Sequence, residues 1–186
     1  MVTGIQADQL RLGFLTANAL NGHGYVGGLL VTNRFGRPLE FQCTTPVKPN
    51  RTQEILYGPT LVPFILAELI GRTLIEKVGV KPHLVLVERP ELLELRGHVA
   101  MPVACLASVE ETADDEQSSQ PPSDSSLQEG RILTLGRRRL RLETAHAADD
   151  DALARHAPHI PGGADLLEPF ERVREALQEA LQLKGE

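Results

Sequence analysis

The sequence predicts an α/β protein in which a three-stranded antiparallel meander is followed by alternating helices and strands. Three observations lead to this prediction. Short apolar runs separated by turn residues occupy the first 45 residues, and a long apolar stretch with helical spacing covers residues 60–78. Two continuous apolar runs, at residues 84–87 and 99–108, are typical of strands that are covered on both faces.

The meander is predicted from three strand-like runs and the turns between them. Residues 10–20 alternate roughly between apolar and polar, residues 25–32 are rich in β-branched and apolar types, and residues 38–45 alternate clearly. Gly22 follows Asn and precedes His-Gly, which is a strong turn signal, and Gly36 can supply a positive φ in the second connection. The first third of the chain therefore reads as three neighbouring antiparallel strands.

The helical stretch is predicted to consist of two pieces. Asn50 is a suitable N-cap for a helix that begins at Arg51. Gly58 and Pro59 are expected to end or kink that helix, because proline cannot continue the hydrogen-bond ladder. A second helix over residues 60–78 carries an apolar stripe wide enough to be well buried.

The later elements are predicted as a short helix, a hairpin and two further helices. The short helix covers residues 91–96, between the two apolar strands, and the hairpin covers residues 131–144. Helices are expected near residues 150–156 and over residues 165–183. The last helix is amphipathic, so we expect one of its faces to dock on the sheet.

The composition divides the chain into an α/β core (residues 1–109), an acidic linker or loop (residues 110–130) and a C-terminal hairpin with helices that packs on the core (residues 131–186). The linker contains no Lys or Arg and too few apolar residues to form a core, so we expect it to be disordered. The whole chain has 19 basic and 25 acidic residues, and seven of the acids lie in the linker. Without the linker, 19 basic residues face 18 acidic ones. Net charge therefore does not support nucleic-acid binding, although it leaves that possibility open.

Several classes of protein are disfavoured by residue usage. The two cysteines, Cys43 and Cys105, each lie in an apolar run, where buried free thiols are commoner than a single disulfide. No zinc-ligand spacing is present, and the start of the chain lacks the pattern of a signal peptide. No uninterrupted apolar stretch approaches membrane-spanning length. We therefore expect a cytoplasmic protein without a metal site or a membrane partner.

The order of the elements, three antiparallel strands followed by helices alternating with strands, resembles that of the ribonuclease H-like fold. Nucleases of this fold place acids on the first strand, the first long helix and the end of the fourth strand, where two divalent metals bind. Glu68 and Glu88 occupy the helix and fourth-strand positions here. The first strand has no acid, and Glu40 on the third strand is the available substitute. The resemblance implies a nuclease or phosphoryl-transfer enzyme that uses Glu40, Glu68 and Glu88 with Mg²⁺ or Mn²⁺.

Two clusters of residues are candidates for binding. One follows the outward face of the third strand into the first helix, and the other lies at the start of the second strand, where two adjacent glycines mark a close approach of a ligand or of a packed helix. The candidate binding residues are His23, Tyr25, Gln42, Thr44, Lys48, Asn50, Arg51 and Tyr57. The alternative for the first cluster is a solvated strand face with a capping residue, and for the second it is tight packing of the long helix.

Taken together, these features favour a non-enzymatic binding or adaptor protein. No compact set of acids, histidines, cysteines or metal ligands of the kind that enzymes need is evident. We expect a protein partner that is held by the meander and by the N-terminus of the first helix. The alternatives are the metal-dependent nuclease and a small-molecule sensor that binds an anion near Asn50.

Overall fold

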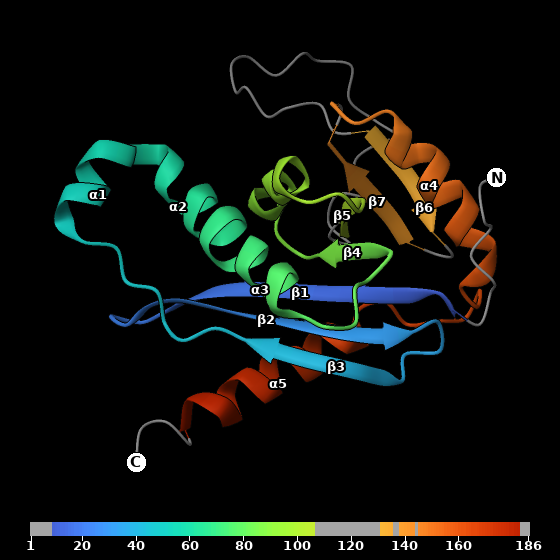
Figure 1. Ribbon diagram of the computed structural model, residues 1–186, viewed down its shortest axis with the longest axis horizontal. Helices are drawn as coiled ribbons and strands as arrows, with labels where there is room; N and C mark the ends of the chain where they lie inside the picture. Colours follow the sequence, from blue (N-terminus) through green and yellow to red (C-terminus); the bar gives the residue numbers. More distant parts are fainter. Residues whose placement is uncertain (1–8, 107–130, 136–137, 144, 183–186) are drawn as a thin grey trace, which may run out of the picture.

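A seven-stranded mixed sheet with helices on both faces forms the centre of the protein (Figure 1). The computed structural model describes residues 9–106, 131–135, 138–143 and 145–182. The predicted acidic linker, residues 110–130, lies outside the described residues. The strand order across the sheet is β3-β2-β1-β4-β5-β7-β6.

The strands confirm the predicted α/β class and the antiparallel meander. They are β1 (Arg11–Leu20), β2 (Gly24–Asn33), β3 (Pro38–Cys43), β4 (Leu84–Val87), β5 (Val103–Leu106), β6 (Arg131–Leu135) and β7 (Arg138–Leu142). β1 pairs antiparallel with β2, and β2 with β3. β4 runs parallel to β1 and to β5, and all four of its residues are buried. The β6–β7 hairpin extends the same sheet, because β7 pairs antiparallel with β5.

The helical elements differ from the prediction chiefly in the long apolar stretch, which is one continuous helical segment. They are α1 (Arg51–Tyr57), η2 (Gly58–Thr60), α2 (Leu61–Pro63), η3 (Phe64–Arg72), α3 (Thr73–Lys77), η4 (Pro90–His98), α4 (Ala148–His156), η6 (Ala157–His159) and α5 (Glu168–Gln182). The predicted end or kink of the first helix at Gly58 and Pro59 takes the form of a tight 3-10 turn, η2, between α1 and α2. Pro59 lies near the start of this turn, where its missing N–H costs nothing, and Gly58 takes a positive φ of 51°. The η3 segment is π-helical, which the apolar spacing did not indicate.

Two neighbouring glycines of β2 bring a helix close to each face of the sheet. A Cβ atom at Gly27 would lie 2.2 Å from Cγ2 of Ile70 in η3. A Cβ atom at Gly28 would lie 2.9 Å from Cγ1 of Val173 in α5, on the opposite face. Close packing of a helix on each face of the sheet, one of the two alternatives for this pair of glycines, is therefore sufficient to explain why both residues lack a side chain.

The alternation of β1 divides the core between the two faces. Leu15 packs with η3 and α3, whereas Phe14 packs with α5 and meets Phe170 edge to face at a centroid distance of 5.4 Å. At the free edge of the sheet, the alternation of β3 places Phe41 and Cys43 against the core on the α5 side. Leu39 does not pack there, and it is exposed, because it lies near the start of the edge strand.

Candidate functional site

The first helix is held in place by a complete capping box. The Asn50 side chain accepts a hydrogen bond from the Gln53 N–H at 2.9 Å, and the Gln53 side chain accepts one from the Asn50 N–H at the same distance. Arg51 forms an ion pair with Glu54 one turn later, at 3.1 Å. Asn50 and Arg51, which were predicted to bind a partner, therefore contribute first to starting and supporting α1.

The connector that leads into α1 is fastened to the β1–β2 turn. Tyr25 and Val47 exchange two backbone hydrogen bonds of 2.8 and 2.7 Å. The Lys48 Nζ donates to the Gly22 carbonyl at 3.3 Å, and the His23 ring nitrogen Nδ1 lies 2.7 Å from the Asn21 carbonyl oxygen. The structure thus brings His23, Tyr25 and Lys48 together beneath the start of α1, where their contacts fix the path of the chain.

The polar face of β3 is also engaged within the protein. The Thr44 hydroxyl accepts a hydrogen bond from the Gly27 N–H at 3.1 Å. Glu40 accepts from the N–H groups of Gly79 and Val80 at 3.1 and 2.7 Å, and from Gln42 Nε2 at 2.9 Å. The hydrogen bond from Gln42, and then those from Val80 and Gly79, lower the pKa of Glu40 because they stabilise the carboxylate. This carboxylate therefore anchors the loop that follows α3.

The three acids of the nuclease alternative do not meet. Glu40 binds the loop after α3 on one side of the sheet, and Glu68 lies in η3, 3.5 Å from His98. Glu88, at the end of β4, accepts from the Thr16 hydroxyl at 2.9 Å and from Arg174 of α5 at 2.7 Å, on the opposite side. Within the residues that the structure describes, no three His, Cys, Asp or Glu side chains are grouped to hold a metal ion. The acids that are present do not fit the divalent-metal site that the resemblance implies.

The chain from residue 51 to residue 60, which we call the arm, contains no buried side chain, and its aliphatic residues Ile55 and Leu56 are exposed to solvent. Figure 1 places α1 at the far end of the helical segment, on the opposite side of the molecule from α4 and the β6–β7 hairpin. All ten residues are exposed except Gln53, which is half-buried. The arm nevertheless carries large apolar side chains, because Ile55 is 65% exposed and Leu56 is 76% exposed.

The apolar surface of the arm continues toward the body of the protein. Tyr57 is exposed and its ring stacks on that of Phe64, with centroids 4.5 Å apart. Leu69, in η3, is also exposed. Tyr57 was predicted as a binding residue from the sequence, whereas Ile55, Leu56 and Leu69 were not. The available signal was three consecutive large apolar residues just before a Gly-Pro pair, which a short helix cannot bury on one face.

The helical segment that ends in the arm is longer and more apolar than the sequence analysis expected. Arg51–Lys77 forms 27 helical residues that are long and apolar enough to cross a membrane by length and composition. Core helices pass the same test, and here Leu66, Ile70 and Leu74 are fully buried against the sheet. The segment meets this length and composition test although its backbone turns at Gly58, whose φ of 51° and ψ of −127° lie outside helical geometry.

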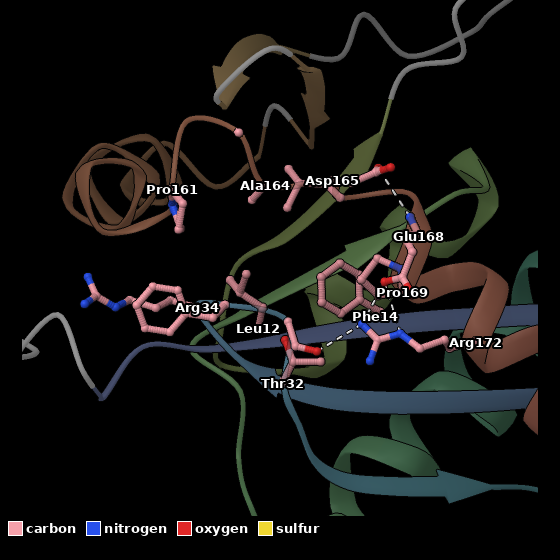
Figure 2. A pocket seen from close by; sticks show the side chains of 14 residues that line it. Leu12, Phe14, Thr32, Arg34, Pro161, Ala164, Asp165, Glu168, Pro169 and Arg172 are labelled. Carbon is pink, nitrogen blue, oxygen red and sulfur yellow. Dashed lines mark hydrogen bonds and ion pairs between the residues drawn. The ribbon is translucent and has the colours of Figure 1, made fainter.

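A cavity of about 320 Å³ opens between the β2–β3 turn and the start of α5 (Figure 2). Its charged groups have partners within the protein. Arg172 contacts Glu168 at 2.8 Å and donates to the Gly36 carbonyl at 3.0 Å. Asp165 accepts a hydrogen bond from the Leu167 N–H and so serves the first turn of α5. Arg172 and Asp165 therefore stabilise the β2–β3 turn and the start of α5, and neither of them is directed at a ligand.

Two comparisons with known proteins gave no match. A scan against protein-family models finds no match, and a search of the curated proteins finds no relative.

Proposed function

We propose that this protein is a non-enzymatic binding or adaptor subunit that holds a protein partner with the arm and the adjoining end of the meander. One observation carries the proposal: the arm exposes Ile55, Leu56 and Tyr57, and α1 has no buried side chain. Exposed apolar patches on folded proteins are characteristic of interaction surfaces. A cytoplasmic location belongs to the same proposal.

The energetics of α1 support this proposal. An isolated helix of seven residues is marginal in water, because nucleation is costly and few hydrogen bonds follow it. Here the capping box and one exposed ion pair support it, without any buried side chain. Burial of Ile55 and Leu56 by a partner would contribute about 1.5–3 kcal/mol for each side chain. A partner would therefore stabilise the arm and gain affinity from the same contacts.

The chemical character of the arm suits a protein surface. Tyrosine and arginine are enriched among residues that dominate binding energy, and Tyr57 and Arg51 flank the two aliphatic side chains. The Tyr57 ring is already stacked on Phe64, so less conformational freedom is lost when a partner covers it. No observation favours the nuclease alternative, because Glu40, Glu68 and Glu88 each bind a different part of the protein.

The test is purification of the tagged, full-length protein from its native cell at moderate salt, with mass spectrometry and the 260/280 nm absorbance ratio as readouts. We expect a stoichiometric protein partner that is lost with Leu56→Asp. The matched control is Ile132→Asp in β6, because Ile132 is 61% exposed and lies on the opposite side of the molecule. This control is expected to retain the partner.

Binding of the partner to purified protein then measures the contribution of the arm. We expect Leu56→Asp to weaken binding by at least about tenfold, since removal of one well-buried side chain costs more than 1.4 kcal/mol. Nucleic acid in place of a protein partner, or equal loss of the partner with Ile132→Asp, would overturn the proposal.

A further inference from the structure

A second cavity, of about 450 Å³, lies where the parallel strands begin, on the side of the molecule away from the arm. Pro82 and His83 lead into β4 and Pro102 leads into β5, and they form one wall. The opposite wall is the face of α4 that carries Asp149, Ala152, Arg155 and His156. The cavity therefore lies between the sheet and a helix, and it combines apolar and ionisable side chains.

His156 is the central polar group of this cavity. Its side chain lines the cavity although the residue is only 7% exposed. Within the described part of the chain, neither of its ring nitrogens has a hydrogen-bond partner. The His83 ring faces it, with ring centroids 6.1 Å apart. The His156 ring nitrogens are not among the buried polar atoms that lack a partner, so they are open to the cavity, where a ligand can reach them.

The groups around the two rings are rich in donors and poor in acceptors. Both oxygens of the buried Asp149 are taken by Arg96, at 2.6 and 3.0 Å. His83 Nδ1 lies 3.1 Å from the Arg11 N–H, and its Nε2 lies 3.2 Å from the Arg11 guanidinium. A neutral imidazole accepts a hydrogen bond at only one of its two nitrogens. One ring nitrogen of His83 therefore carries a hydrogen that faces an N–H group of Arg11. An additional acceptor at this wall would relieve that arrangement.

Arg155 supplies a cation whose charge is not used elsewhere in the described residues. It lines the cavity, is exposed, and forms no ion pair there, not even with Asp151 one turn earlier on α4. Positive charge and N–H donors thus converge on a space that contains no free carboxylate among the described residues. The apolar part of the lining includes Met101 and Pro102.

We infer that this cavity binds a small organic anion whose carboxylate or phosphate lies between His156, His83 and Arg155 and whose carbon skeleton packs on Met101 and Pro102. The volume exceeds that of a bare oxyanion and lies in the range of small-molecule sites. Arginine and imidazole donors form strong, charge-assisted hydrogen bonds with either anion. This inference is independent of the proposed adaptor role, because the arm lies on the other side of the molecule.

Binding is expected to strengthen as the pH falls from 8 to 6, because the bound anion favours protonated imidazoles. Without a ligand, burial first, and then Arg11 and His156, hold the pKa of His83 below its ordinary value. Burial first, and then Arg155 and His159, lower the pKa of His156 in the same way. Arg96 also faces the cavity but is neutralised by Asp149. The net field in the cavity is positive, and an anion reduces it.

The experiment titrates the full chain with phenyl phosphate, inorganic phosphate and propionate at constant ionic strength, with chloride as the reference. Isothermal calorimetry and the thermal unfolding midpoint are the readouts. We expect at least one of the two organic anions to bind saturably. Phenyl phosphate is expected to bind more tightly than inorganic phosphate. The ring nitrogens of His156, observed by NMR, should shift on binding.

The variants separate a specific site from general charge attraction. Arg155→Gln, at an exposed position that is compatible with folding, is expected to weaken binding at least about tenfold, and His156→Gln to make the pH dependence of binding shallower. His98→Gln, at an exposed histidine beside Glu68, is the matched control and should bind normally. Absence of saturable binding at millimolar concentration, or equal binding by Arg155→Gln and the unchanged protein, would overturn the inference.

Discussion

The two ends of the helical segment Arg51–Lys77 have similar apolar side chains but different surroundings. Toward its C-terminal end, Ile70 and Leu74 are fully buried against β2 and the neighbouring strands. At its N-terminal end, Ile55 and Leu56 are exposed to solvent. The difference arises because η3 and α3 lie over the sheet, where Gly27 lets the helix approach, whereas the arm extends past it.

The difference in burial distinguishes the apolar residues that stabilise the fold from those that do not. The buried end stabilises the fold by removing apolar surface from water. Ile55 and Leu56 in the arm contribute little to this burial, and under the proposed function they are covered by a partner. The comparison holds if substitutions in the body destabilise the protein and equivalent substitutions in the arm do not.

The largest effect is expected at the ion pair that joins α4 to η4 in the body. Asp149→Ala leaves the Arg96 guanidinium buried without its partner, and we expect the free energy of unfolding to fall by about 3–5 kcal/mol. Urea unfolding followed by circular dichroism measures this loss. Asp151→Ala, at an exposed position on the same helix, is the control and should change stability little. Equal effects of the two substitutions would contradict the role of the ion pair.

Ile70→Ala tests the buried end of the helical segment directly. The side chain is fully buried and packs over Gly27, so its removal leaves a cavity in the core. We expect a loss of about 2–5 kcal/mol in the free energy of unfolding, measured by the same urea titration. A loss below 1 kcal/mol would mean that the helix is held less firmly on the sheet than its burial indicates.

A smaller and pH-dependent effect is expected from His83 and His156. Their pKa values are lowered in the folded protein, mainly by burial, so folding favours the neutral rings. Their contribution to stability is therefore complete above the ordinary histidine pKa of about 6.5 and is lost progressively as the pH falls below it. Urea unfolding between pH 8 and 5, in buffers without phosphate or carboxylate, measures this decline. The double variant His83→Gln/His156→Gln should show a shallower decline, and an identical slope would refute the assignment.

The smallest effect is expected in the arm, where Ile55→Ala makes the aliphatic truncation that Ile70→Ala makes in the core. Because Ile55 is mostly exposed, the free energy of unfolding of the isolated protein should change by no more than about 0.5 kcal/mol. The same substitution should weaken partner binding. A large loss of stability without a partner would show that the arm is part of the folding core and would end the comparison.

The sequence by itself determined the α/β class, the meander and the amphipathic last helix. These features can be read from local periodicity alone: β1 and β3 alternate between apolar and polar residues, and β4 is a continuous apolar run. The N-cap at Asn50 was predicted for the same reason, because a cap and the first turn that it serves are neighbours in sequence. The candidate residues Lys48 and Thr44 were found as polar groups, but their roles were not, since each contacts a residue at least 17 positions away in the chain.

Long-range packing determines which apolar and ionisable side chains of the described residues are left exposed to solvent or to a cavity. A helical pattern predicts an apolar stripe but not how far the sheet extends beneath it, so the exposure of Leu56 could not be read from spacing. The meeting of His83 with His156 joins positions 73 residues apart, across the acidic segment. Both depend on long-range packing, which brings together residues that no local pattern relates.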